Sequence, residues 1–110
     1  IARQAGRHEW ACFAAHQSAE KALKALHLSL GQEAWGHLIA RLLRELPIAA
    51  PSELLDKART LDALYIPTRY PDAFPEGAPA EHYGPSQSRE AFTHAEAILG
   101  FVRTQMAQPG

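Results

Sequence analysis

The sequence predicts an all-α protein, an up-and-down bundle of four to five helices with a long ordered, proline-rich loop before the last helix. Apolar residues recur every three or four positions in several segments, which is the spacing of a buried helical face. No segment shows the alternation of a half-buried strand. The chain has 110 residues, of which 46% are hydrophobic, so we assign residues 1–110 to a single domain with one core.

The first predicted helix runs from His8 to Leu30, and Gly31 ends it. Alanine is the best helix former and allows neighbouring helices to approach closely, so this alanine-rich segment suits a tight helix pair or the seam of a dimer. The chain opens on IARQAG without a capping residue, and we expect its N-terminal helix to be truncated. The positions expected to face inward are Cys12, Ala15, Ala19, Ala22 or Leu23, Leu26 and Leu30.

Two helices follow in the middle of the chain. The segment HLIARLLREL, residues 37–46, places leucines on one face and is ended by Pro47. The next helix is expected to begin at an N-cap, Ser52, and to run to Tyr65. The last helix is expected to begin at a second cap, Ser86, with five residues inward: Phe92, Ala95, Leu99, Val102 and Met106.

The segment between Tyr65 and Tyr83 reads YIPTRYPDAFPEGAPAEHY and contains four prolines. Prolines reduce the entropy lost when a loop becomes ordered, and the aromatic residues offer apolar surface that could pack on the bundle. Long ordered loops are often functional, so we expect an ordered flap that forms one wall of a site. The alternative is a surface loop that only covers the core.

The composition excludes several classes of function. The formal net charge is −1, so the chain has no overall positive field to hold nucleic acid, and any such binding must be local. The single cysteine, Cys12, excludes an intrachain disulfide and fits a reducing cytoplasm. No apolar run is long enough to span a membrane, and no signal peptide is visible. The histidines show no metal-ligand spacing, so neither a metal nor a cofactor is expected.

Three segments taken together resemble one known family. ACFAAHQSAEKALKAL, WGHLIARLLREL and the proline-rich loop look like those of a small prokaryotic HEPN domain (higher eukaryotes and prokaryotes nucleotide-binding). The resemblance spans nearly the whole chain. It implies a helical bundle that forms a homodimer, binds nucleotide or single-stranded RNA, and is often encoded beside a minimal nucleotidyltransferase antitoxin in a toxin–antitoxin pair. Some members are metal-independent ribonucleases.

The ribonuclease signature of that family is an arginine followed, after four to six residues, by a histidine. Here REAFTH supplies Arg89 and His94 as tentative catalytic residues. Histidine can move protons near neutral pH, and arginine can hold the charge of a phosphorane. The alternatives are that Glu90 and His94 form an ordinary surface pair on a helix, and that the domain is a non-catalytic dimeric interaction module.

Four residues are tentative phosphate or nucleotide contacts: Arg69, Tyr70, Lys21 and Lys24. Arginine binds phosphate through two donors and tyrosine can stack on a base, which together with the last helix would place a cleft at the proline-rich loop. Alternatively, Arg69 pins the loop to a helix end and the lysines belong to a solvated face shared with Glu20. We expect His16 to be a hydrogen-bonded core or interface residue and His37 to serve packing or capping.

Overall fold

The computed structural model describes the backbone of residues 3–69 and 84–108 and the side chains of residues 7–65 and 84–108. Within these ranges the chain forms helices and no strand, which confirms the predicted all-α class. The four helices are α1 (Arg3–Ser29), α2 (Ile39–Arg44), α3 (Ser52–Arg69) and α5 (Pro85–Ala107).

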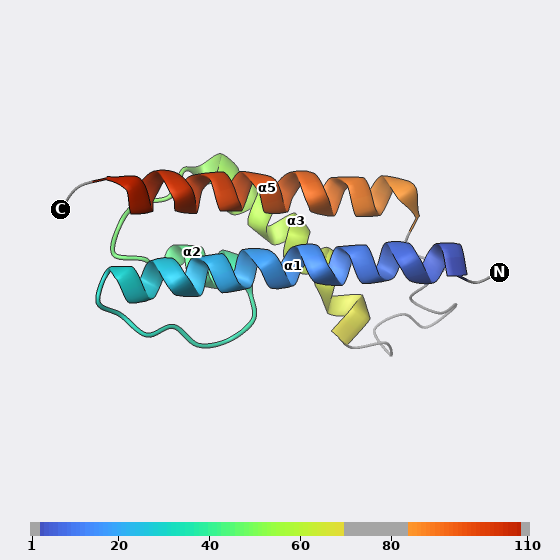
Figure 1. The fold of residues 1–110 in the computed structure, drawn as a ribbon, viewed down its shortest axis with the longest axis horizontal. Coiled ribbons are helices and arrows are strands. Elements are labelled where there is room, and N and C mark those ends of the chain that lie inside the picture. The colour runs from blue at the N-terminus through green and yellow to red at the C-terminus, as the bar shows by residue number, and fades with distance from the viewer. Residues whose placement is uncertain (1–2, 70–83, 109–110) are drawn as a thin grey trace.

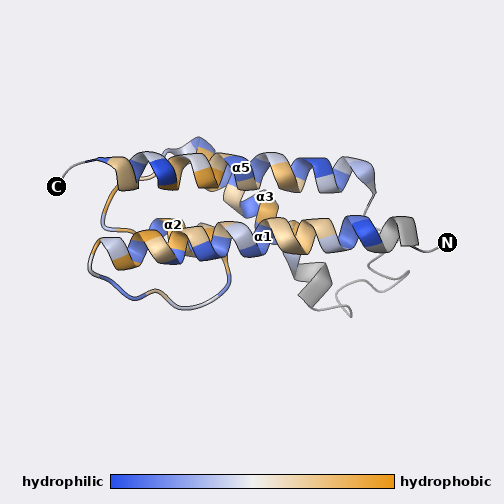
Figure 2. Cartoon of the chain, viewed as in Figure 1, coloured by the Kyte–Doolittle hydropathy of each residue, from blue (hydrophilic) through white to orange (hydrophobic). Residues whose placement is uncertain are grey.

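The two longest helices, α1 and α5, lie side by side and run in the same direction, from right to left in Figure 1, so the predicted up-and-down arrangement is wrong for this pair. Behind them α3 crosses obliquely and returns in the opposite general direction, while the short α2 packs against both α1 and α3. Figure 2 shows polar and apolar stretches alternating along α1 and α5, as expected for amphipathic helices that bury one side. The buried apolar residues come from all four helices and form one core.

The helix α1 starts at Arg3, five residues before the predicted start, and ends where Gly31 was expected to end it. Gly31 has a φ of 83°, and its N–H donates to the carbonyl of Leu28. The N–H of Gln32 donates to the carbonyl of His27, five residues back. This is the Schellman arrangement, in which glycine takes the left-handed position at lowest cost. The helix therefore ends before Leu30. This residue was predicted to face inward, but it is exposed.

The middle of the chain departs from the prediction at both ends of α2 and at both ends of α3. The helix α2 is only six residues long, shorter than residues 37–46. The helix α3 begins at Ser52 itself, because the carbonyl of Pro51 already accepts from Leu54 and Leu55, so Ser52 is not the N-cap. The same helix continues past Tyr65, where the loop was expected, to Arg69. It includes Pro67 in its final turn, where a missing N–H removes a single backbone hydrogen bond.

The predicted ordered flap falls mainly on residues 70–83. These residues, which include Tyr70, lie outside the described residues. The helix that follows begins at Pro85 with Gly84 as its N-cap, two residues before the expected Ser86. The side-chain oxygen of Gln87 accepts from the N–H of Gly84 at 3.0 Å, which caps this end.

The predicted inward face of α5 is correct in part. Ala95 and Val102 are buried, whereas Phe92 is 62% exposed and Met106 is 47% exposed. Leu99 is half-buried. The face of α5 that packs on α1 and α3 consists of Ala91, Ala95, Ile98 and Val102. The row formed by Phe92, Leu99 and Met106 lies on a different side of the helix.

Candidate functional site

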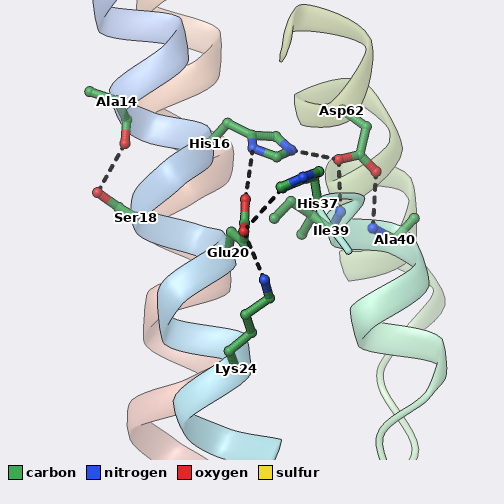
Figure 3. Close-up of polar contacts among 9 residues, drawn as sticks. All are labelled: Ala14, His16, Ser18, Glu20, Lys24, His37, Ile39, Ala40 and Asp62. Atoms are coloured by element: carbon green, nitrogen blue, oxygen red, sulfur yellow. Dashed lines mark hydrogen bonds and ion pairs between the residues drawn. The ribbon is translucent and has the colours of Figure 1, made fainter. Parts of the chain in front are cut away.

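A cluster of ionisable side chains lies where α1, α3 and the start of α2 meet (Figure 3). It consists of His16, Glu20 and Lys24 on α1, Asp62 on α3, and His37 on the connection before α2. His16 is fully buried, and Glu20 and Asp62 are only 8% and 7% exposed. Burying such groups is costly unless they are paired, so the pairing within the cluster determines what it can do.

Asp62 joins three parts of the chain. One carboxylate oxygen accepts from the backbone N–H of Ile39 at 2.8 Å and lies 2.9 Å from Nε2 of His16, while the other accepts from the N–H of Ala40 at 3.0 Å. Asp62 thereby satisfies the first amides of α2 from a helix distant in sequence and holds α1 to α3 through His16. Because a carboxylate that accepts two amides carries no proton of its own, Nε2 of His16 is the donor in this pair.

Glu20 has a different environment at each of its two oxygens. Oε2 accepts from Nζ of Lys24 at 2.9 Å and lies 3.4 Å from Nδ1 of His37. Oε1 faces Nδ1 of His16 at 4.0 Å, which is too long for a hydrogen bond. Among the described residues, neither Oε1 of Glu20 nor Nδ1 of His16 has a hydrogen-bond partner, although both atoms are buried.

A row of aromatic rings fixes the position of His16. Its imidazole stacks on Tyr65 with ring centroids 3.7 Å apart and an angle of 11° between the planes. Phe13 packs on the same tyrosine at 6.0 Å, and Trp10 packs on Phe13 at 5.3 Å. Since Trp10 is 64% exposed, the row runs from the surface of α1 to the buried imidazole.

A small groove lies beside the C-terminal end of α1, one side of it formed by the connection to α2. It encloses about 260 Å³ and is lined by Lys24, Leu28, Glu33, Ala34 and Trp35. Trp35 is 76% exposed, and the adjacent Gly36 has a φ of 98°, a value that favours glycine. The volume is below the 300–1,000 Å³ typical of ligand pockets, so the groove suits one planar ring better than a whole nucleotide.

The Arg89 and His94 pair lies on α5, at the other end of the molecule. Arg89 is exposed and is the fifth residue of the helix, so it does not sit at the helix entry. Five residues along a continuous helix rotate the side chain by about 140°, so the two side chains of one chain diverge. Nε2 of His94 lies 3.7 Å from a carboxylate oxygen of Glu90, as in the pair considered as an alternative, but the His94 side chain is only 17% exposed and so the pair is not fully on the surface.

The start of α5 is tied to α1 near these residues. Nδ1 of His8 lies 2.8 Å from the hydroxyl oxygen of Ser88, which itself donates to the carbonyl of Pro85.

Burial, together with the nearby carboxylates of Glu90 and Glu9, raises the pKa of the Cys12 thiol to about 11. Cys12 is therefore a protonated core thiol at neutral pH and not a nucleophile.

Comparison with known proteins identifies the family. The HEPN domain model matches residues 1–105. The chain belongs to the HEPN domain family. It is similar to the crystal structure of TT1696 from Thermus thermophilus, with 45% identity over 94% of each chain and a TM-score of 0.84. It is also similar to ST0689, an archaeal HEPN homologue, with 42% identity over 94% of this chain and 84% of that one and a TM-score of 0.75. No curated protein matches.

Within this HEPN domain the tentative site residues do not form one cluster. His8 on α1 touches Ser88 at the start of α5, and the two helices run the same way. Lys24 therefore lies about 24 Å further along α1 than the start of α5, at roughly 1.5 Å per residue. Arg69 is the last residue of α3, and its side chain and Tyr70 lie outside the described residues. Lys21 is exposed. Lys24 pairs with Glu20, but Glu20 is only 8% exposed, so the pair does not lie on the solvated face expected as the alternative.

Sequence reasoning missed two features of the HEPN domain. Asp62 was not singled out, because a lone acidic residue in a helical pattern looks like a solvated position, and only the contact with α2 shows its role. Trp35 was passed over as part of a short connection, although two glycines and a tryptophan within GQEAWG were a usable signal. The expectation for His16 is confirmed, since it is a buried hydrogen-bonded residue. His37 does not cap α2, as its ring faces Glu20.

Within residues 3–69 and 84–108, no three His, Cys, Asp or Glu side chains are grouped so that they could hold a metal ion. None of the helices in these ranges is both long enough and apolar enough to cross a membrane.

Proposed function

We propose that this HEPN domain binds nucleotide or RNA, with a base in the groove beside α1 and its phosphate on Lys24. The observation that carries the proposal is that a tryptophan exposed by 76% and a lysine line the same groove. An exposed aromatic ring provides a stacking platform for a base, and a nearby ammonium group binds the phosphate that follows it. Lys21, exposed three residues before Lys24 on the same helix, would contact a neighbouring phosphate.

Replacing Trp35 tests the stacking platform. Trp35→Ala is expected to weaken binding of a short single-stranded RNA by about 1–3 kcal/mol, the usual contribution of one stacked base. Trp10→Ala is the matched control, because Trp10 is also exposed but packs on Phe13 away from the groove. Isothermal titration calorimetry measures both affinities. Equal affinity of the Trp35→Ala variant and the wild type would contradict this site.

The second candidate function is metal-independent cleavage of RNA by Arg89 and His94. Nδ1 of His94 is buried, so Nε2 is the nitrogen left to accept a proton from a ribose 2′-OH. The exposed Arg89 would stabilise the charge on the phosphorane. Because the two side chains of one chain diverge around α5, this function would need the arginine of one copy to meet the histidine of another.

A homodimer is proposed from the outer side of α5. Phe92, Leu99 and Met106 are seven residues apart, which places them in one row along the helix. Two of the three are large apolar side chains exposed by 62% and 47%. A second copy of the chain would cover this row. A homodimer is also the basis of the alternative function, a non-catalytic module that pairs with a minimal nucleotidyltransferase in a toxin–antitoxin system and for which the alanine-rich first helix was expected to form the dimer seam.

A charge placed in this row tests the dimer. Phe92→Asp is expected to raise the dissociation constant of the dimer at least tenfold, because an unpaired charge would be buried at the interface. Thr93→Asp introduces the same charge at the adjacent exposed position, about 100° around the helix, and should leave association unchanged. Sedimentation velocity distinguishes the species. A Phe92→Asp protein that associates like the wild type would rule out this row as the interface.

A further inference from the structure

Two buried acceptor atoms face each other inside the polar cluster. Nδ1 of His16 and Oε1 of Glu20 are 4.0 Å apart, and neither has a hydrogen-bond partner among the described residues. Nε2 of His16 carries the proton that is donated to Asp62, so a neutral His16 directs a lone pair toward the carboxylate oxygen. A second proton, on Nδ1, would replace this repulsion between two acceptors with an attraction between opposite charges.

In the free protein the countercharge of Glu20 is the ammonium group of Lys24, which also lines the groove. Nζ of Lys24 lies 2.9 Å from Oε2 of Glu20, and the Lys24 side chain, which is 32% exposed, also lines the groove. A phosphate in the groove would compete for the ammonium group that Figure 3 shows beside Glu20. If Lys24 turned to the phosphate, the carboxylate of Glu20 would stay almost fully buried without its closest cation.

We propose that His16 sets the affinity of the groove for phosphate by taking up one proton at Nδ1 when Lys24 turns from Glu20 to the ligand. This inference rests on the proposed function. The proton comes from the solvent, and the imidazolium replaces Lys24 as the countercharge of Glu20. Stacking on Tyr65 and the bond to Asp62 hold the ring in place, so the charge changes without rearrangement of the core. His16 is thus a positioning residue that acts through Glu20 and Lys24.

The competing proton acceptors are the carboxylates of Glu20 itself and of Glu33, which lines the groove, and the other groups that face His16. On α3, Asp62 accepts two backbone amides and would not take the proton, and Tyr65 presents its ring face. On the connection before α2, Nδ1 of His37 lies 3.4 Å from Glu20, and its side chain is 46% exposed. Among the described residues, His37 is therefore the one other histidine at this carboxylate that could take up the proton, and the experiment must separate it from His16.

The sign of the pH dependence follows from linkage. If binding takes up a proton, then protons favour binding, and the affinity rises as the pH falls. Uptake of one full proton corresponds to about a tenfold rise in affinity for each unit of pH.

The probe is the deoxydinucleotide d(ApA). Its single phosphodiester does not titrate near neutral pH, and without a 2′-OH it is not a substrate for cleavage. Calorimetric titrations near neutral pH in Tris and in HEPES, which have different ionisation enthalpies, give the number of protons taken up. We expect uptake of up to one proton by the wild type. The His16→Gln variant should bind d(ApA) about tenfold more weakly, and its binding enthalpy should be the same in both buffers. Glutamine can still donate to Asp62 but takes up no proton. His37→Gln should keep the uptake.

Each result leads to a decision. Binding of d(ApA) by the wild type without proton uptake would overturn this inference and leave the proposed function standing. Uptake that persists in His16→Gln, or is lost in His37→Gln, would overturn it as well. No binding at all would overturn the proposed function and the inference together. If His16→Gln does not fold, the ¹⁵N chemical shift of Nδ1 of His16 in the wild type is measured with and without d(ApA). A shift typical of an unprotonated nitrogen that stays the same when d(ApA) binds would contradict the proposal.

Discussion

Replacing Asp62 with alanine is expected to lower the free energy of unfolding by at least about 3 kcal/mol, because it leaves three buried donors without an acceptor, at about 1–3 kcal/mol each. The change removes the acceptor for the amides of Ile39 and Ala40 and for Nε2 of His16. All three donors are buried and would lose their partner without access to water. Since small domains are stable by only about 5–15 kcal/mol, this loss is a large part of the total.

Urea unfolding followed by circular dichroism measures this effect. Asp56→Ala is the matched control on the same helix, because Asp56 pairs with Arg59 at 3.0 Å while both side chains are largely exposed. Exposed pairs of this kind contribute about 0–1 kcal/mol. A loss below about 1 kcal/mol in Asp62→Ala would show that the three donors find other partners and that Asp62 does not hold α2 in place.

The second large effect is expected on RNA cleavage. If the ribonuclease function holds, His94→Ala should lower the cleavage rate of single-stranded RNA in EDTA by about 10²–10⁴-fold, the usual contribution of a general acid–base group. The products of the wild type should carry a cyclic phosphate, since the 2′-oxygen attacks the phosphorus and the 5′-oxygen leaves with a proton. Arg89→Ala should cost about 10²–10³-fold, in line with loss of one charge-stabilising donor.

Two controls accompany the cleavage assay. Glu90→Gln removes the carboxylate 3.7 Å from His94 and should preserve or raise the rate, because a negative charge near the phosphate is unfavourable. His37→Ala alters an exposed histidine outside α5 and should have little effect on cleavage. Undiminished cleavage by His94→Ala would remove this residue from the mechanism. No cleavage by the wild type would leave nucleotide binding as the function to pursue.

Much of the fold could be predicted from periodicity and from a few residues with special backbone preferences. The recurrence of apolar residues located all four helices, and Gly31 marked the end of α1 because glycine adopts positive φ readily. The predictions failed mainly at helix boundaries. Ser52 and Ser86 are good caps by type, yet α3 and α5 begin at Ser52 and Pro85. The loop was predicted from Tyr65 because prolines disfavour helices, whereas α3 tolerates Pro67 in its last turn.

The candidate sites were harder to predict because they depend on contacts between distant segments. The Arg89 and His94 motif is visible in the sequence, but only the continuous α5 shows that the two side chains diverge. The row of Phe92 and Met106 was expected to face the core, since periodicity gives the spacing of a face and not the direction in which a helix turns it. The groove depends on where the connection brings Trp35 relative to Lys24.

The all-α class, the order of the helices and the family resemblance can be read from the amino-acid sequence, because they depend on local propensity, on spacing along the chain and on short motifs. The buried cluster of His16, Glu20 and Asp62 is visible only in the folded chain, since its pairing requires α1, α3 and the start of α2 to meet. Hydrogen bonds act over about 3 Å, and a separation of 46 residues between His16 and Asp62 carries no information about that distance.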